Sequence, residues 1–212
     1  MLKVKSFTFN PFGENTYIVY SENGECIIFD PGMYLSSEQE ELSRFIDANQ
    51  LKPIHLINTH CHIDHIFGNT YCADKYNLKL KAHQLEKSIL AMGEQSAMLY
   101  GLKYHKSVEI KTSINEKETI EIGQDQLELR FTPGHSPGSL SFYNQDFNFV
   151  IVGDALFKHS IGRTDLPGGD HQTLINSIKS ELLSLPDQTI VYSGHGDPTT
   201  IGEERKSNPF LQ

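Results

Sequence analysis

The chain has 212 residues, enough to bury a sizeable core without disulfide bonds or metal ions to stabilise it. We expect a single domain spanning residues 1–212. Its formal net charge of -9 provides no basic field for a phosphate backbone, which argues against a nucleic-acid partner. No segment approaches the ~20 apolar residues of a membrane span, and the amino terminus lacks a signal-like apolar core, so we expect a soluble, cytoplasmic protein with no membrane partner.

The first third of the chain predicts four strands and one helix. The strands are expected where apolar and polar residues alternate, or where short apolar runs end in turn residues, at 2–9, 15–20, 26–29 and 54–57. The helix is expected from Ser37, which has the form of a capping box with Glu40, to about Asn49, because apolar residues recur there at helical spacing.

Four metal-competent side chains follow the fourth strand within six residues. His60 and His62 are two positions apart, so at the end of an extended strand their imidazoles point to one side and Cys61 points away. A helix that begins near Asp64 would place Asp64 and His65 in its first turn, where free amides and the helix dipole favour a carboxylate. Nitrogen and oxygen ligands crowded this closely indicate a divalent metal such as zinc, manganese or iron.

The three cysteines are an odd and sparse set without the pattern of a disulfide framework. We therefore expect Cys26, Cys61 and Cys72 to be reduced thiols. A metal-ligand role for Cys61 is the minor alternative, because its strand phase opposes that of the two neighbouring histidines.

The rest of the chain continues the alternation of strands and helices. Strands are expected at 78–82, 119–122, 126–132, 139–143, 147–152 and 189–192, and helices from His83 to about Leu90 and from about His171 to Leu183. Residues 91–106 have a loose pattern and form either a helical connection with some substrate contact, the interpretation we favour, or a lid over the active site. The whole order indicates an α/β sandwich with its functional residues at the carboxyl ends of strands.

Three later loops add the ligands that the first stretch lacks. His135 lies between two Pro-Gly turns, Asp154 ends an apolar strand, and His195 is flanked by glycines. A two-metal site needs about eight protein contacts for cations ~3.5–4 Å apart, and a carboxylate can bridge them. We assign seven ligands: His60, His62 and His135 to one metal, Asp64, His65 and His195 to the other, and Asp154 between them.

This ordered set of histidines and aspartates, from His60-x-His62-x-Asp64-His65 through to His195, resembles the metallo-β-lactamase superfamily over essentially the whole chain. The resemblance implies a four-layer αββα sandwich of two similar halves, with a dinuclear metal site along one edge.

Within that superfamily the sequence is most similar to the glyoxalase II (hydroxyacylglutathione hydrolase) branch, especially its short bacterial type. The similarity rests on residues 132–138, 153–157, 160–165 and 208–211. Long glyoxalase II enzymes carry an additional carboxyl-terminal helical domain that helps to hold glutathione, whereas this sequence ends at Gln212, so we expect a high KM for a glutathione thioester.

The resemblance implies a thioester hydrolase in which two divalent cations, zinc first and iron or manganese as alternatives, supply a hydroxide. The expected small-molecule substrate is an S-acyl glutathione such as S-lactoylglutathione, and Asp64 is the candidate for orienting the hydroxide and accepting its proton. Arg163 falls where glyoxalase II-like proteins place a basic residue near the glutathione carboxylate, although a surface salt bridge would also account for it. Asp165, Tyr100 and Tyr104 are weaker candidates for substrate contact.

Two other functions compete with this interpretation. A persulfide dioxygenase-like oxidoreductase would bind a single iron with part of the same ligands, and His65 and His195 would then be superfluous. A non-catalytic metal module would close its four positions with protein, whereas seven ligands leave room for a water. A secreted β-lactamase is disfavoured by the lack of a signal sequence.

Overall fold

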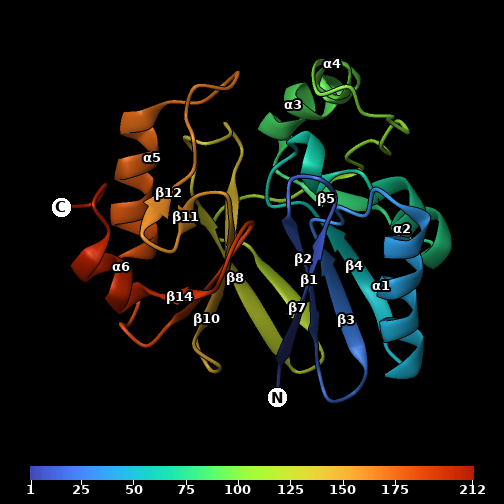
Figure 1. Cartoon of the computed structure of the whole chain (residues 1–212). Coiled ribbons are helices and arrows are strands. Elements are labelled where there is room, and N and C mark those ends of the chain that lie inside the picture. The colour runs from blue at the N-terminus through green and yellow to red at the C-terminus, as the bar shows by residue number, and fades with distance from the viewer.

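The computed structural model describes residues 1–212 as two six-stranded β-sheets packed face to face, with helices on both outer faces (Figure 1). The strand order is β1-β2-β3-β4-β5-β6 in the first sheet and β14-β13-β10-β9-β8-β7 in the second. In Figure 1 α1 and α2 cover the first sheet, and α5 and α6 cover the second. The predicted αββα sandwich is therefore confirmed. No helix combines the length and the apolar composition that crossing a membrane requires.

The strands and helices occupy these residues. The first sheet contains β1 (Lys3–Phe9), β2 (Glu14–Tyr20), β3 (Glu25–Phe29), β4 (Lys52–Ile57), β5 (Leu80–Ala82) and β6 (Thr112–Ser113). The second contains β7 (Thr119–Ile122), β8 (Asp125–Phe131), β9 (Leu140–Asn144), β10 (Phe149–Gly153), β13 (Ile190–Ser193) and β14 (Thr199–Thr200), and β11 (Leu156–Phe157) pairs with β12 (Ser160–Ile161) alone. The covering helices are α1 (Ser36–Ala48), α2 (Asn69–Tyr76), α5 (His171–Ser177) and α6 (Ile201–Ser207).

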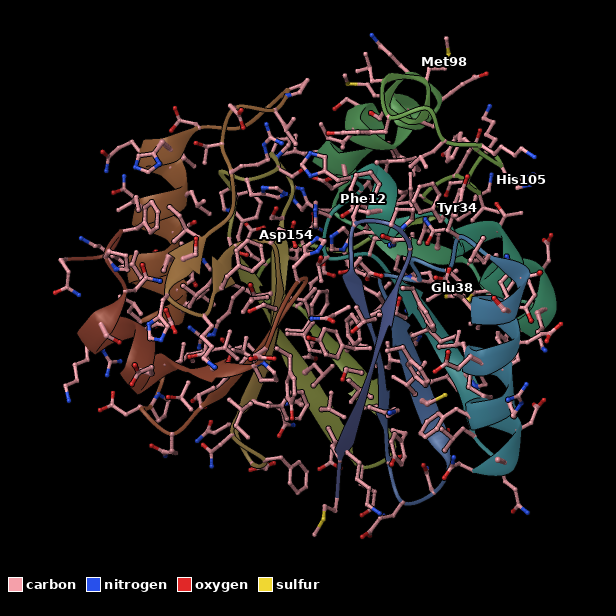
Figure 2. The ribbon with its side chains drawn as sticks, in the orientation of Figure 1. Phe12, Tyr34, Glu38, Met98, His105 and Asp154 are labelled. Atoms are coloured by element: carbon pink, nitrogen blue, oxygen red, sulfur yellow. The ribbon has the colours of Figure 1, made fainter.

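The parallel strand pairs bring several strand ends to one rim of the sandwich. β4 runs parallel to both β3 and β5 in the first sheet, and β10 runs parallel to β13 in the second. The loops after these strands therefore open on the same side as the turn between β1 and β2. Figure 2 shows Phe12 of that turn and Asp154 of the loop after β10 at this rim, below the α3–α4 pair.

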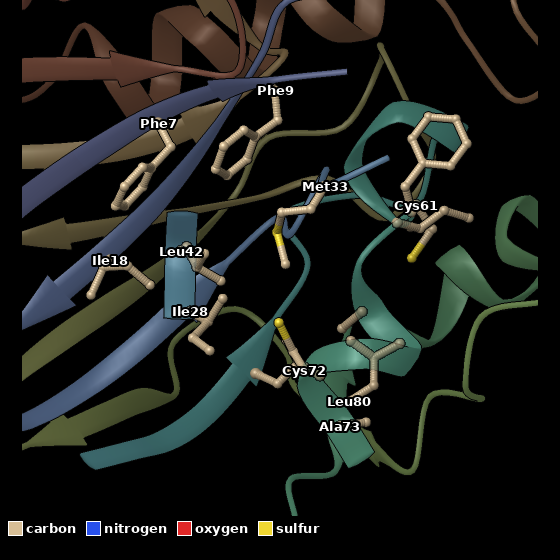
Figure 3. Packing of buried hydrophobic residues seen from close by; sticks show 14 of the residues in the cluster. Phe7, Phe9, Ile18, Ile28, Met33, Leu42, Cys61, Cys72, Ala73 and Leu80 are labelled. Atoms are coloured by element: carbon tan, nitrogen blue, oxygen red, sulfur yellow. The ribbon is translucent and has the colours of Figure 1, made fainter. Parts of the chain in front are cut away.

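The central strands are apolar on both faces because each face packs against a different layer. On β3, Ile27 and Phe29 face the second sheet, where the Phe29 ring lies 4.8 Å from the ring of Phe142. Ile28 points the other way, into an outer core with Leu42 of α1 (Figure 3). The same alternation in β2 fixes the strand register, since a slip of one residue would exchange the two faces.

The three cysteines are free, as expected, and all three are buried. Cys61 and Cys72 belong to the outer core under the first sheet, with Met33 and Leu80 (Figure 3). Cys61 takes no part in the groups of side chains that can hold a metal, which agrees with the phase argument.

Two predicted helix starts are wrong, each for a local reason. The residues Ile63–His65 form one 3-10 turn (η1), and α2 begins only at Asn69, because the side chain of Asn58 donates to the carbonyl of His65 at 2.9 Å. The helix α1 begins before Ser37, and the Glu38 carboxylate accepts from the backbone N–H of Leu35 at 2.9 Å. A carboxylate at the third position of the helix thus satisfies the free N–H of the residue that caps it.

The region from His83 to Lys106 is also more divided than predicted. A 3-10 turn, η2 (Gln84–Glu86), leads into α3 (Lys87–Ala91) and then α4 (Gly93–Leu99), which together stand over the rim (Figure 1). The predicted helix from His171 is observed as α5 followed by a π-helical segment, η3 (Ile178–Leu182). The short elements β6, β11, β12 and β14 and the helix α6 carry too little periodicity to be predicted.

Candidate metal centre

Three histidines that are distant in sequence form the first cluster at the rim: His60, His62 and His135. His60 and His62 lie in the loop after β4 rather than on the strand, and His135 lies in the loop after β8. The Nε2 atom of His135 is 3.2 Å from Nε2 of His60 and 2.8 Å from Nδ1 of His62. Three ring nitrogens at these separations surround a point where one cation fits.

Hydrogen bonds on the far side of two rings leave their inner nitrogens free to accept a metal. Nδ1 of His135 is 2.8 Å from the backbone carbonyl of Arg163, so it must carry the proton. Nδ1 of His60 is 3.1 Å from the hydroxyl of Thr59, which itself donates to Asp30 at 2.6 Å. Both Nε2 atoms then present lone pairs to the cluster, and these outer partners fix the ring orientations.

A second cluster, Asp64, His65 and His195, lies beside the first. Oδ2 of Asp64 is 3.1 Å from Nε2 of His195 and 3.7 Å from Nε2 of His65. The opposite nitrogen of His65 lies 3.2 Å from Asp30. Asp30 therefore braces one histidine of each cluster, directly or through Thr59.

Asp154 reaches both clusters, as its assigned bridging position requires. Its Oδ1 is 3.4 Å from Nε2 of His65, and its Oδ2 is 3.5 Å from His135 and 3.6 Å from His195. Gly194 makes this approach feasible, since a Cβ atom there would come within 2.0 Å of the Asp154 carboxylate. All seven side chains predicted from the sequence thus lie together in the structure.

The donor set fits divalent metals. Nε2 of His65 and Oδ1 of Asp154 are buried and have no hydrogen-bond partner, although buried polar atoms almost always have one. The two atoms lie 3.4 Å apart, beside the carboxylate of Asp64, and a bound cation would satisfy both. The fold and these histidine and aspartate groups together imply divalent metal ions.

The two clusters differ in charge. Burial lowers the pKa of His60 well below its usual value and that of His62 to about 3, so these rings are neutral ligands. Burial acts in the same direction on His65, but the nearby carboxylates of Asp154 and Asp64 outweigh it and raise the pKa of His65. The carboxylate of Asp64 thus belongs to the second cluster, and that of Asp154 lies beside both.

The loop that carries His195 is held by the first sheet. The Asn15 side chain in β2 donates to the carbonyls of Ser193 at 3.1 Å and Gly196 at 2.9 Å. The hydroxyl of Tyr17 donates to the same Ser193 carbonyl at 2.6 Å. The position of His195 thus depends on contacts between the two halves of the sandwich.

Glu86 is a supporting residue that sequence reasoning missed. It is fully buried, and its carboxylate accepts from the N–H of Cys61 at 2.7 Å, the hydroxyl of Ser136 at 2.5 Å and the N–H of Gly138 at 2.6 Å. One side chain thereby ties the loop of His60 and His62 to the loop of His135. Nothing in the local sequence signals this role, because its partners lie 25 to 52 positions away.

We expect Glu86→Gln to weaken metal binding at the first cluster by about tenfold to a hundredfold, the range typical of residues that orient metal ligands. The amide NH₂ cannot accept a hydrogen bond, so at least one of the three donors would lose its partner. Competition with a chromophoric chelator measures the affinity, and Glu94→Gln, at an exposed position of α4, is the matched control. A lower melting temperature with unchanged metal affinity would restrict Glu86 to a structural role.

A cavity of about 590 Å³ opens onto both clusters. It is lined by five of the seven metal-competent side chains, His62, Asp64, His135, Asp154 and His195. Its other walls are mostly apolar and include Phe12, Ile89, Met92, Leu99, Tyr100 and Leu166. A concave, largely apolar space beside convergent polar groups is the usual form of a small-molecule site.

The predicted substrate contacts are placed unevenly around this cavity. Arg163 lines it, but its guanidinium pairs with Asp165 through two hydrogen bonds of 2.7 and 2.8 Å, which is the surface salt bridge that the sequence also allowed. Tyr100 also lines the cavity. Tyr104 and Asp165 do not line it, and the Tyr104 hydroxyl accepts from the N–H of Ser107.

Comparisons with known proteins agree with this geometry. The model of the Metallo-beta-lactamase superfamily matches residues 9–195. A probable metallo-hydrolase of Bacillus subtilis, YqgX, is 39% identical over 99% of this chain and 98% of its own length, and the hydroxyacylglutathione hydrolase GloC of Haemophilus influenzae is 32% identical over 94% and 93%. The crystal structure of the BLEG-1 B3 metallo-beta-lactamase superposes with a TM-score of 0.91 at 38% identity, covering 99% of this chain and 100% of that one.

Proposed function

The chain belongs to the metallo-beta-lactamase superfamily and is a metal-dependent hydrolase, and from this premise we propose that it hydrolyses thioesters, S-acyl glutathiones such as S-lactoylglutathione first among them. The observation that carries the proposal is the pair of ligand clusters sharing Asp154 at the floor of the cavity. The similarity to GloC supports a glutathione thioester as substrate.

We assign the two clusters to two divalent cations, zinc first, with iron and manganese also suited to mixed nitrogen and oxygen ligands. Held there, the cations would lower the pKa of a bound water and polarise the thioester carbonyl. The second cluster argues against the single-iron oxidoreductase. An enzyme with one iron would leave Asp64, His65 and His195 close together with no metal to bind. The open cavity beside the ligands argues against a purely structural metal module.

Asp64 is the proposed proton acceptor. It lines the cavity, and although its burial opposes ionisation, the neighbouring His65 and the hydrogen bond from His195 lower the pKa of Asp64. It is thus ionised at neutral pH and can orient a water at the reacting carbonyl. The apolar walls limit competing solvent, which strengthens electrostatic interactions inside the cavity.

A substrate panel tests the function. Protein loaded separately with zinc, iron and manganese is assayed with S-lactoylglutathione, with an S-acyl N-acetylcysteamine and with a chromogenic cephalosporin. We expect turnover of the thioesters. Hydrolysis of the cephalosporin without turnover of either thioester would refute the proposal in favour of a β-lactamase.

Substitution of Arg163 tests whether the thiol carrier of the substrate is glutathione. Arginine binds a carboxylate through paired charge-assisted hydrogen bonds, so Arg163→Ala should lower kcat/KM for S-lactoylglutathione about tenfold to a hundredfold, the 1.5–3 kcal/mol of a hydrogen bond to a charged group. The N-acetylcysteamine thioester, which has no carboxylate near sulfur, should be almost unaffected. The His135 contact survives in this variant, because it uses the backbone carbonyl of Arg163.

Asp165→Asn is a second variant for the same kinetic experiment, with the opposite expected effect. Because Asp165 holds the Arg163 guanidinium in the structure, weakening this pair should free the guanidinium and lower KM for the glutathione thioester. An equal loss on both thioesters in Arg163→Ala would make Arg163 structural. No loss on either would exclude it from substrate binding.

A further inference from the structure

One wall of the cavity is built largely from apolar side chains, with Gln95 and Ser96 of α4 as its polar members. Ile89 and Met92 of the α3 region, Leu99 of α4 and Phe12 of the β1–β2 turn all line it. Tyr100 completes this wall, its ring meeting that of Phe12 edge to face with centroids 5.0 Å apart. We call these five side chains the α3–α4 wall.

Part of this wall is costly to leave in water. Leu99 is 79% exposed and Tyr100 is 49% exposed, although both line a cavity that leads to the metal-competent residues. Exposed apolar side chains gathered at the mouth of a cavity mark a surface that a ligand covers. Figure 2 shows where the wall begins, with Phe12 between Asp154 and the α3–α4 pair.

The charges of the cavity lie elsewhere. Outside the two clusters the only charged residue lining it is Arg163, which comes from the loop after β12 and is paired with Asp165. A glutathione thioester has a charged peptide half and an acyl half joined at the reacting carbonyl. The peptide half matches the Arg163 side, and the α3–α4 wall remains for the acyl group.

We propose that the α3–α4 wall is a subsite for a straight aliphatic acyl chain, so that thioesters of several carbons are better substrates than S-lactoylglutathione. This inference rests on the proposed thioesterase function and names the acyl class that it prefers. The short hydroxylated lactoyl group would bury little of the wall. A chain of six to eight carbons, by contrast, would cover Met92 and Leu99.

The expected size of the effect follows from apolar burial. Each methylene moved from water onto an apolar surface strengthens binding roughly three- to fourfold. Allowing for partial contact, kcat/KM should rise at least about tenfold from S-butanoylglutathione to S-octanoylglutathione. The affinity of non-hydrolysable S-alkylglutathione thioethers should rise with chain length in the same way.

The test measures both quantities on metal-loaded protein, kcat/KM for the thioesters and calorimetric affinity for the S-butyl, S-hexyl and S-octyl thioethers. Leu99→Gln and Met92→Gln should each reduce the dependence on chain length severalfold. Met98→Gln is the matched control, because Met98 is 75% exposed on the same helix but does not line the cavity. Figure 2 places Met98 at the outer tip of α4.

The outcomes separate this inference from the function on which it rests. Thioester hydrolysis that is indifferent to chain length would overturn the subsite and leave the thioesterase intact. Affinity that rises with chain length while no thioester is hydrolysed would keep the subsite and overturn the thioesterase. Affinity that is flat across the thioethers, or length dependence that is equal in all three variants and the parent protein, would remove the α3–α4 wall from substrate binding.

Discussion

Asp154→Asn is expected to lower turnover by roughly a hundredfold or more and to weaken both metal sites together. The substitution keeps the shape of the side chain and removes the negative charge that lies 3.4 to 3.6 Å from histidines of both clusters. A hundredfold loss of turnover corresponds to about 2.7 kcal/mol of lost transition-state stabilisation. Steady-state kinetics together with elemental analysis of the same preparation measures it.

The matched control for this experiment is Asp146→Asn, the same chemical change at an exposed residue in the turn between β9 and β10. It should alter neither metal content nor turnover. An Asp154→Asn protein that retains two metals and near-normal turnover would show that another group bridges the clusters.

The second large effect concerns stoichiometry: active protein should contain about two metals per chain, and His65→Ala should lose one of them preferentially. Of the two clusters, His65 belongs to the second: its Nε2 lies near Asp64 and Asp154, and its Nδ1 lies 3.2 Å from Asp30. The first cluster keeps its three histidines in this variant. Elemental analysis after extensive dialysis against metal-free buffer gives the ratio.

His105→Ala is the control for histidine removal, because His105 is exposed and lies at the periphery of the molecule (Figure 2). One metal per chain in fully active protein, retained without loss of activity in His65→Ala, would rule out the dinuclear assignment. A single-iron oxidoreductase would then be the better-supported function.

The sheets and the seven side chains at the rim were predictable because both follow from local patterns. Alternation of apolar residues locates the strands, and function is expected at the carboxyl ends of strands, so His60, His135 and Asp154 were each expected at such a rim. The tight spacing of donors from His60 to His65 is itself typical of a metal site, so this stretch indicated the chemistry before any fold was known.

The supporting residues could not be predicted, because their roles depend on contacts between distant parts of the chain. Glu86 resembles any glutamate near a helix start until folding buries it beneath two ligand loops. The sequence around Asp30 indicates only the end of a strand, yet this carboxylate braces Thr59 and His65. The start of α2 differs from the prediction for a more local reason, since the Asn58 side chain that donates to the His65 carbonyl lies only seven positions before it.

The hydrogen bonds from β2 to the His195 loop bear on the folding free energy of the whole molecule. The proposed ligands come from both sheets, so each bound cation would act as a cross-link between the two halves in addition to the contacts of Asn15 and Tyr17. A ligand present at about a thousandfold above its Kd stabilises the folded state by about 4 kcal/mol, a large share of a typical folding free energy. When the supply of metal falls, the protein would therefore lose activity and also unfold more often. Its lifetime in the cell would then become shorter as the metal concentration decreases.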